Sequence, residues 1–186
     1  MLRILAFAGS GDFDKESQDA VGVILLCAAT AGSMVPSAKA ASSEAAFAFS
    51  ADPAIGAQQR AAYAVVHQYE QYLNAGNTPG ILDLFAPQSV TEWNDKPTFV
   101  TRAQKQIGYE ALFEIAKFST VFGYASIDID GDIAIVRTFH HKGAAVLENS
   151  KPVPDYNREV FILRKLNGVY KIVFYMFNTD PAQGEG

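Results

Sequence analysis

Hydrophobic residues in the segment 57–75 recur every three or four positions, which is the spacing of one helical face. The stripe consists of Ala62, Val65, Val66, Tyr69 and Leu73. Gly76 follows and predicts the end of this helix. Thr78 and Pro79 then indicate a shorter helix, capped by Thr78, which runs through ILDLF and ends before Pro87.

A short strand and a third helix are predicted next. Residues 89–93, SVTEW, alternate in polarity as a strand does. Thr101 and Gln104 match the pattern of a capping box, so we expect a helix from there to Lys117. We expect a break or an irregular start near Gly108, and an apolar stripe made of Ile107, Ala111, Leu112 and Ile115.

From residue 119 onward the hydrophobic pattern alternates, which is typical of β-strands. Asp130-Gly131 and Asn167-Gly168 predict tight hairpin turns. The segment NSKPVPDY holds two prolines and is predicted to be a loop. The predicted strands are 119–129, 132–141, 157–165 and 169–178. Helices followed by a meander of antiparallel strands indicate an α+β fold.

The last predicted strand is apolar on both faces. Val173, Tyr175 and Phe177 alternate with Ile172, Phe174 and Met176. An antiparallel sheet with one face in water alternates more cleanly, so we expect one face to pack on the helices and the other to be covered too. A second copy of the chain is the simplest cover, which predicts a homodimer formed through the sheet.

Residues 1–50 differ in character from residues 51–186. The run 20–34 is apolar and uncharged but too short to span a bilayer comfortably. It resembles the core of a secretory signal, and Ala38 and Ala40 fit a cleavage site, which predicts an exported or periplasmic protein with no membrane span after cleavage. Four acidic residues precede the run, where a signal carries basic ones. The alternative is a disordered arm on a cytoplasmic protein.

Composition narrows the classes of function. The chain has 186 residues, of which 49% are hydrophobic, enough for one domain with a proper core. The formal net charge of -5 argues against a nucleic-acid binder, because such proteins neutralise phosphates with basic residues. Cys27 is the only cysteine, which excludes an intramolecular disulfide and a cysteine-based metal cluster.

Three strand residues are candidates for catalysis: His140, Glu159 and Arg137. His140 and His141 are adjacent on a strand, so their side chains diverge and cannot chelate one metal together; we expect no metal and no cofactor. Histidine titrates near neutrality and suits a general base. Glu159 is either a proton shuttle buried among apolar groups or the partner of Arg137 in a structural ion pair.

Several segments between about residues 57 and 180 carry a family resemblance. They are YLNAGN, ILDLFAPQSV, GYEALFE, IDGDIAIV and, most specifically, NREVFILRKLNGVYKIVFYMFN. They resemble the SnoaL-like group, polyketide cyclase-like or SgcJ-like, of the nuclear transport factor 2-like superfamily. The resemblance implies a cystatin-like cone, in which a curved antiparallel sheet wraps around about three N-terminal helices. Residues 51–186 would then form one SnoaL-like domain with a pocket at the open end and dimers through the sheet.

Such a pocket is apolar and aromatic, with few polar groups. The side chains expected to contact a ligand are Tyr69, Trp93, Tyr109, Phe113, His141, Asn157, Tyr175 and Asn178. The aromatic residues among them are more typical of an ordinary protein core than of a ligand-binding surface. The catalytic sets of the isomerase and epoxide hydrolase members do not transfer residue by residue.

Two functions therefore stay open. The first is a dimeric protein that binds a small apolar or aromatic molecule. The second is an enzyme, an isomerase, cyclase or dehydratase, that performs acid/base chemistry on an apolar carbonyl compound. A purely structural dimerisation module is the third reading.

Overall fold

The computed structural model describes residues 47–141 and 144–179. The signal-like run and its cleavage site lie outside these residues, so export stays a prediction. The helices of the described part are α1 (Pro53–Asn74), α2 (Thr78–Leu84) and α3 (Arg102–Ile115). The strands are β1 (Phe85–Glu92), β2 (Ala116–Lys117), β3 (Phe122–Asp130), β4 (Ile133–His140), β5 (Ala145–Glu148), β6 (Lys151–Pro154), β7 (Asn157–Leu166) and β8 (Val169–Thr179). None of the described helices is long and apolar enough to cross a membrane.

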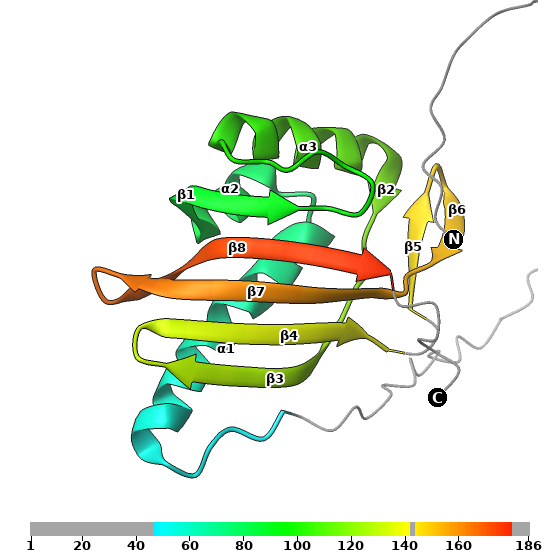
Figure 1. The fold of residues 1–186 in the computed structure, drawn as a ribbon. Coiled ribbons are helices and arrows are strands. Elements are labelled where there is room, and N and C mark those ends of the chain that lie inside the picture. Colours follow the sequence, from blue (N-terminus) through cyan, green and yellow to red (C-terminus); the bar gives the residue numbers. More distant parts are fainter. Residues whose placement is uncertain (1–46, 142–143, 180–186) are drawn as a thin grey trace, which may run out of the picture. The chain divides into compact units, whose positions relative to one another are not determined.

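Five strands form a curved sheet in the order β1-β8-β7-β4-β3, with α1 lying across one face (Figure 1). This confirms the α+β cone but corrects one detail, because the sheet is mixed. β1 pairs in parallel with β8, whereas the other neighbours in this sheet are antiparallel. β1 enters the sheet from α2 rather than through a hairpin, so no tight turn forces it to be antiparallel.

The first helix follows the predicted stripe. Asp52 caps it, and its Oδ1 accepts hydrogen bonds from the backbone N–H groups of the residues at 54 and 55. Pro53 occupies the first turn, where its fixed φ suits a helix. The buried side chains of this helix include Ala62, Val66, Tyr69 and Leu73. Both capping and periodicity thus act through local chemistry that is readable from the chain.

The predictions for the two later helices, α2 and α3, need corrections. Asn77, not Thr78, caps α2, and its Oδ1 accepts from the N–H of Gly80 at 3.0 Å. The capping box of Thr101 and Gln104 is confirmed. The helix runs unbroken through Gly108, and Ile107 is 67% exposed because α3 turns a different face inward.

The inward face of α3 carries Lys105 and Tyr109. Gly108 lies directly under two aromatic rings on this side of the helix. A Cβ there would come within 3.0 Å of Phe99 and 3.3 Å of Trp93. The glycine therefore allows close packing rather than breaking the helix.

Both predicted hairpins are present, and a third was missed. Asn167 and Gly168 have positive φ, as a type I′ turn requires. The segment predicted as a proline-containing loop instead supplies the turn and the second strand of the β5–β6 hairpin, and this hairpin joins β2 in a separate small sheet. Its turn also places two residues, Asn149 and Ser150, at positive φ. The prolines lie in β6, an edge strand, where a missing N–H is tolerated.

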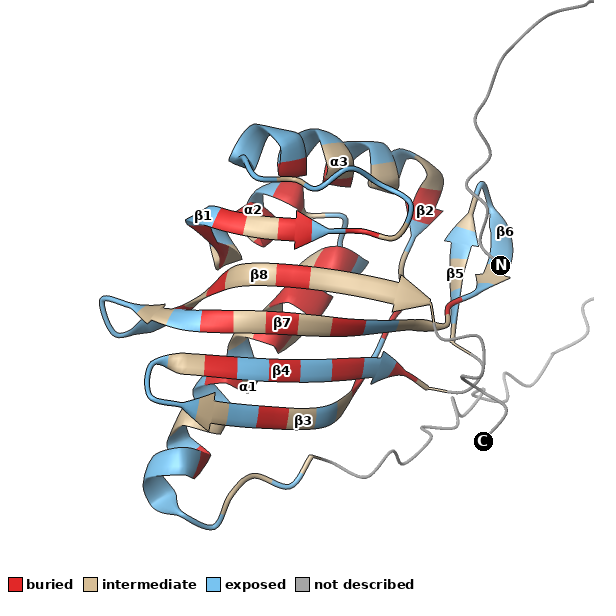
Figure 2. Cartoon of the chain, in the orientation of Figure 1, coloured by how far each residue is buried: buried red, intermediate tan, exposed pale blue. Residues whose placement is uncertain are grey.

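A β-bulge changes which side chains of β8 face the core. Leu163 pairs with Ile172 and Ile162 with Phe174, so Val173 is the extra residue. Tyr170 and Ile172 point inward before the bulge, and Tyr175 is buried after it. The simple alternation predicted for this strand was therefore wrong. Figure 2 shows buried bands on the central strands of the sheet.

Candidate functional site

The candidate site lies at one end of the five-stranded sheet. β4 ends there with His140, which pairs across the ladder with Phe122 at the start of β3. Glu159, near the start of β7, pairs with Phe177 near the end of β8. The antiparallel ladder therefore places strand ends and strand starts from four neighbours at one edge, where polar and aromatic side chains gather.

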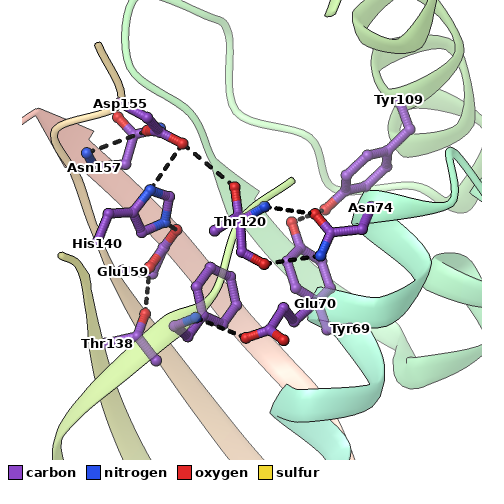
Figure 3. Close-up of polar contacts among 11 residues, drawn as sticks. Tyr69, Glu70, Asn74, Tyr109, Thr120, Thr138, His140, Asp155, Asn157 and Glu159 are labelled. Atoms are coloured by element: carbon purple, nitrogen blue, oxygen red, sulfur yellow. Dashed lines mark hydrogen bonds and ion pairs between the residues drawn. The ribbon is translucent and has the colours of Figure 1, made fainter. Parts of the chain in front are cut away.

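His140 is the centre of a buried polar cluster formed with Asp155, Glu159, Thr138 and Thr120 (Figure 3). Its Nε2 lies 2.9 Å from Glu159 Oε1. Its Nδ1 lies 2.8 Å from Asp155 Oδ2, an ion-pair contact rather than a well-directed hydrogen bond. The side chains of the histidine and both acids are at most 3% exposed.

Strand register explains the Glu159 side of this cluster. Thr138 and Glu159 are direct cross-strand partners, and the Thr138 hydroxyl donates to Glu159 Oε2. His140 is two residues beyond Thr138 on the same face of β4, so it is the diagonal neighbour of Glu159. Alternation in β4 and β7 is therefore sufficient to bring these three side chains together.

Asp155 reaches the cluster from the connection between β6 and β7. Its backbone N–H donates to the carbonyl of Ala144 at 2.8 Å. Its Oδ1 accepts from the N–H of Asn157, and its Oδ2 lies 3.5 Å from the Thr120 hydroxyl. The β5–β6 hairpin thus delivers the second carboxylate to His140.

The two carboxylates determine the charge of His140. Burial alone would lower its pKa, because it disfavours the imidazolium. Hydrogen bonds and charge attraction from Asp155 and Glu159 outweigh burial and raise the pKa of His140 to about 10. At neutral pH the ring is therefore an imidazolium with one carboxylate beside each of its two nitrogens.

Helix α1 contacts the same region through Glu70 and Asn74. Glu70 Oε2 accepts from the backbone N–H of Phe122 at 2.7 Å, and burial raises the pKa of this carboxyl. Asn74 exchanges two hydrogen bonds with the backbone of Thr120, each 2.8 Å long. These contacts fix the start of β3, and with it Thr120, against the helix.

A cluster of aromatic rings lies beside the polar cluster. The Tyr69 and Tyr109 hydroxyls are 2.9 Å apart, and the Tyr175 ring lies 5.2 Å from that of Tyr69. Burial raises the pKa of all three phenols well above the ordinary value, so they are neutral at pH 7. The rings of Trp93 and Phe113 also pack against the ring of Tyr109.

Phe122 and Phe161 connect the phenol rings with the ring of His140. Phe122 stacks on the His140 ring at 5.3 Å and on Tyr69 at 6.4 Å. Phe161 stacks on Tyr175 at 4.6 Å. The aromatic network thus contacts the polar cluster directly, through the ring of Phe122 against that of His140.

The structure brings together some of the sequence candidates. His140 and Glu159 meet in the polar cluster, and Tyr69, Tyr109, Trp93, Phe113 and Tyr175 form one aromatic network. His141 and Asn157 are half-buried nearby, and Asn157 contributes its backbone N–H. The Nδ1 of His141 is buried without a hydrogen-bond partner in the described part of the chain.

Arg137 and Asn178 lie elsewhere. Arg137 is exposed and pairs in register with Val160, on the opposite face from Glu159. The expected ion pair with Glu159 is therefore wrong, because adjacent β4 residues alternate faces and Thr138 occupies the inward position. Asn178 Oδ1 accepts from Arg158 at 2.7 Å, which uses the amide in a cross-strand contact.

Asp155, Thr138, Thr120 and Glu70 were missed by sequence reasoning. Thr138 had a detectable signal, because it shares the parity of His140 in an alternating strand. Asp155 had a weaker one, as a lone acid next to a proline directly before a strand. Its contact with His140 depends on the path of the missed hairpin.

No family model and no curated protein matches this sequence. Solved structures do match in three dimensions. A ketosteroid isomerase-like protein from Erwinia carotovora atroseptica is 17% identical, with TM-score 0.61 over 66% of this chain and 95% of its own. A protein of unknown function with a cystatin-like fold from Nostoc punctiforme is 14% identical, with TM-score 0.54 over 75% of this chain and 100% of its own.

A nuclear transport factor 2-like protein of unknown function from Pseudomonas putida is 15% identical, with TM-score 0.53 over 66% of this chain and 86% of its own. Identities this low establish architecture and leave activity open. The SnoaL-like assignment within the superfamily stays a prediction. On the element order, the sheet topology and these likenesses together, the described residues have the nuclear transport factor 2-like fold.

Proposed function

We propose that this domain binds a small, largely apolar molecule among the aromatic rings, with a polar group of the ligand directed toward the His140 cluster. The observation that carries the proposal is the convergence of a buried imidazolium and an aromatic network at the same end of the sheet. Sites for small molecules combine apolar walls with a few oriented polar groups in this way.

Buried polar atoms without partners support the same proposal. Trp93 Nε1 and Thr91 Oγ1 are buried and make no hydrogen bond within the described residues. Such atoms carry a desolvation cost of about 1–3 kcal/mol each, which a ligand's hydrogen bond would offset. Thr91 lies on the inward face of β1. Trp93 directly follows that strand and packs against Tyr109.

The test is a thermal-shift screen of the full chain against apolar ketones, aromatic aldehydes and aromatic acids, followed by titration of the hits. We expect at least one class to raise Tm in a concentration-dependent manner. Trp93→Phe should weaken that shift, and Val121→Ala, an exposed position outside the site, should leave it unchanged. The absence of any shift across the panel contradicts the proposal.

Acid/base catalysis is the second candidate function, and the Asp155–His140–Glu159 arrangement favours it. An imidazolium held between two carboxylates can supply a proton on one side while a carboxylate accepts one. The neutral Tyr69–Tyr109 phenol pair would donate a hydrogen bond to a developing oxyanion. The corresponding reaction class is proton abstraction next to a carbonyl group.

Hydrogen–deuterium exchange at the carbon next to the carbonyl of a bound ketone tests catalysis without knowledge of the product. We expect exchange in D₂O, followed by NMR, to be faster with wild type than in buffer. Glu159→Gln should lower the rate about 10²-fold or more. Arg137→Gln, on the outer face, should keep it. Binding without exchange in wild type leaves ligand binding standing and removes the enzyme proposal.

We also propose that the outer face of the sheet joins two copies of the chain. Ile135 and Phe139 are 39% and 37% exposed there. Half-buried apolar side chains from β7 and β8 share this face in the register, namely Val160, Ile162, Phe174 and Met176. Arginines and aspartates border this face, including Arg137, Arg164, Asp128 and Asp130. The arginines of one copy can therefore form ion pairs with the aspartates of the other.

A further inference from the structure

The β5–β6 hairpin lies at the end of the sheet that carries the candidate site, and its side chains do not anchor it in the core. Each residue from 144 to 154 is exposed or half-buried, as Figure 2 shows for the two strands, and none of them belongs to the hydrophobic core of the described residues. Segments with few buried apolar contacts open at the lowest free energy. The hairpin can therefore move without disturbing the core.

The base of the hairpin is tied to a buried group. Asp155 directly follows β6, and its N–H donates to the carbonyl of Ala144 at the other end of the hairpin. Its carboxylate lies 2.8 Å from Nδ1 of His140. The base also continues into β4 and β7, so it is fixed on both sides. A hinge at the base lets the remainder of the hairpin swing as one unit.

The tip of the hairpin is held by backbone pairing with β2. Lys117 and Leu147 form one of the two cross-strand pairs there, and the Asn149 N–H donates to the carbonyl of Ile115 at 2.7 Å. Ile115 is the last residue of α3, and β2 follows it directly. The hairpin thus runs from the end of the sheet to the end of α3 (Figure 1). Breaking a few backbone hydrogen bonds releases its tip.

The aromatic network packs between the same two elements. The Trp93 ring lies 4.8 Å from that of Tyr109 on α3 and 6.1 Å from that of Phe177 on β8. Trp93, Tyr109 and His140 are 8%, 0% and 2% exposed. A ligand directed to these side chains reaches them only when part of the domain moves.

We propose that the β5–β6 hairpin is a lid over this end of the aromatic network, hinged beside Asp155 and closed by the pairing of its tip with β2. The inference deepens the ligand-binding function proposed above and rests on it for what passes under the lid. The movement itself needs no ligand, because a minor open state exists in the free protein and a ligand only shifts its population. The closed lid excludes water from the site, as closing loops do in other proteins.

A disulfide lock tests the lid on the full chain. Lys117→Cys/Leu147→Cys joins the tip to β2, whereas the control, Ala145→Cys/Pro154→Cys, joins only the two strands of the hairpin to each other. Both are exposed antiparallel cross-strand pairs, whose Cα atoms are typically about 4.5–5.5 Å apart, within the range of a disulfide. Both variants also carry Cys27→Ser, which removes the only native cysteine.

Acrylamide quenching of fluorescence is the readout, because Trp93 is the only tryptophan of the chain and acrylamide is a small neutral molecule. Oxidation of the lock should lower the quenching constant about threefold or more relative to the same variant reduced with dithiothreitol, since contact with a buried ring requires opening. The control should be quenched equally in both redox states. Equal quenching of the lock in both states would overturn the lid, and so would a decrease shared by both disulfides.

Amide hydrogen exchange of the wild type, followed by mass spectrometry, is an independent measurement that needs no disulfide. In urea too dilute to unfold the domain, the amides of β5 and β6 should exchange faster than those of β7. Equal protection would contradict the proposal, because the hairpin would then open only with the whole domain.

Neither experiment uses a ligand, so the two proposals fail separately. A thermal-shift panel without hits contradicts the function proposed above and leaves the movement of the hairpin standing. A lock without effect contradicts the lid alone.

Discussion

His140 shows how two neighbours decide the character of one side chain. A buried histidine is ordinarily neutral, because burial disfavours its charge. Here Asp155 and Glu159 approach opposite ring nitrogens at 2.8 and 2.9 Å. Their attraction reverses the effect of burial, so the ring is charged in the core. This arrangement makes each member dependent on the other two.

Replacing the histidine should therefore be costly. In His140→Gln the two carboxylates face each other without a cation, and breaking a buried ion pair from one side costs about 3–5 kcal/mol. Urea denaturation at pH 7 should show a loss of this size. Arg137→Gln, one of the exposed residues of the same strand, should stay within about 0.5 kcal/mol of wild type. Equal effects of the two substitutions would contradict the cluster.

The pH dependence of stability follows from the same shift. The pKa of His140 rises from 6.5 to about 10 on folding, so the folded state binds the proton more tightly than the unfolded state. The stabilisation is complete below pH 6.5 and is lost as pH rises through 10, at about 1.4 kcal/mol per pH unit at most. Unfolding free energies measured from pH 6 to 10 should fall in wild type and fall less in His140→Gln. Parallel curves would refute the assignment.

Local sequence signals determine the helices and strands more strongly than they determine the candidate site. The α3 helix begins at a complete capping box, in which Thr101 accepts from the Gln104 N–H and Gln104 accepts from the Thr101 N–H. The β5–β6 hairpin begins and ends without an equally clear signal, yet it supplies Asp155. An element that is hard to read from sequence thus carries an important part of the candidate site.

Thr101→Ala should remove one of the two reciprocal contacts and cost about 1 kcal/mol. Chemical denaturation measures this loss directly. Thr101→Ser keeps the hydroxyl and should restore most of the stability, since serine caps as well as threonine. A serine variant as unstable as the alanine variant would mean that the threonine methyl group, rather than the cap, matters.

The domain as a unit presents one apolar sheet face that the helices of the described residues do not cover. Ile135 is a suitable probe of the proposed dimer, because it is 39% exposed near the centre of β4. Ile135→Glu should convert a dimer to a monomer in sedimentation velocity, since a buried carboxylate at an interface is strongly unfavourable. Ile107→Glu, at a 67% exposed position on α3, is the matched control and should stay dimeric. A monomeric wild type at high micromolar concentration contradicts the dimer.

Features whose determinants are local were predicted correctly from the sequence. The α1 stripe, the Thr101 capping box and the two glycine-containing hairpins follow from spacing and turn chemistry within a few residues. The inward orientation predicted for Ile107 was wrong, because the rotation of α3 about its own axis depends on what the helix packs against. The alternation predicted for β8 was wrong from Val173 onward, because a bulge reverses which side chains face inward and the sequence carries no signal for that bulge. The ion pair between Arg137 and Glu159 was wrong for a simpler reason. Only the register of β4 against β7 shows which face of the sheet Arg137 occupies.

Periodicity, capping and turn residues are short-range properties, so the chain alone specified an α+β order and placed His140 and Glu159 on strands. Whether those strands turned the two side chains toward each other depended on register and on which face the helices covered. The contact with Asp155 required a hairpin to fold back from a separate small sheet, and the exposure of Arg137 required its neighbour to face inward. Such relations join residues distant in the chain, and only packing in three dimensions establishes them.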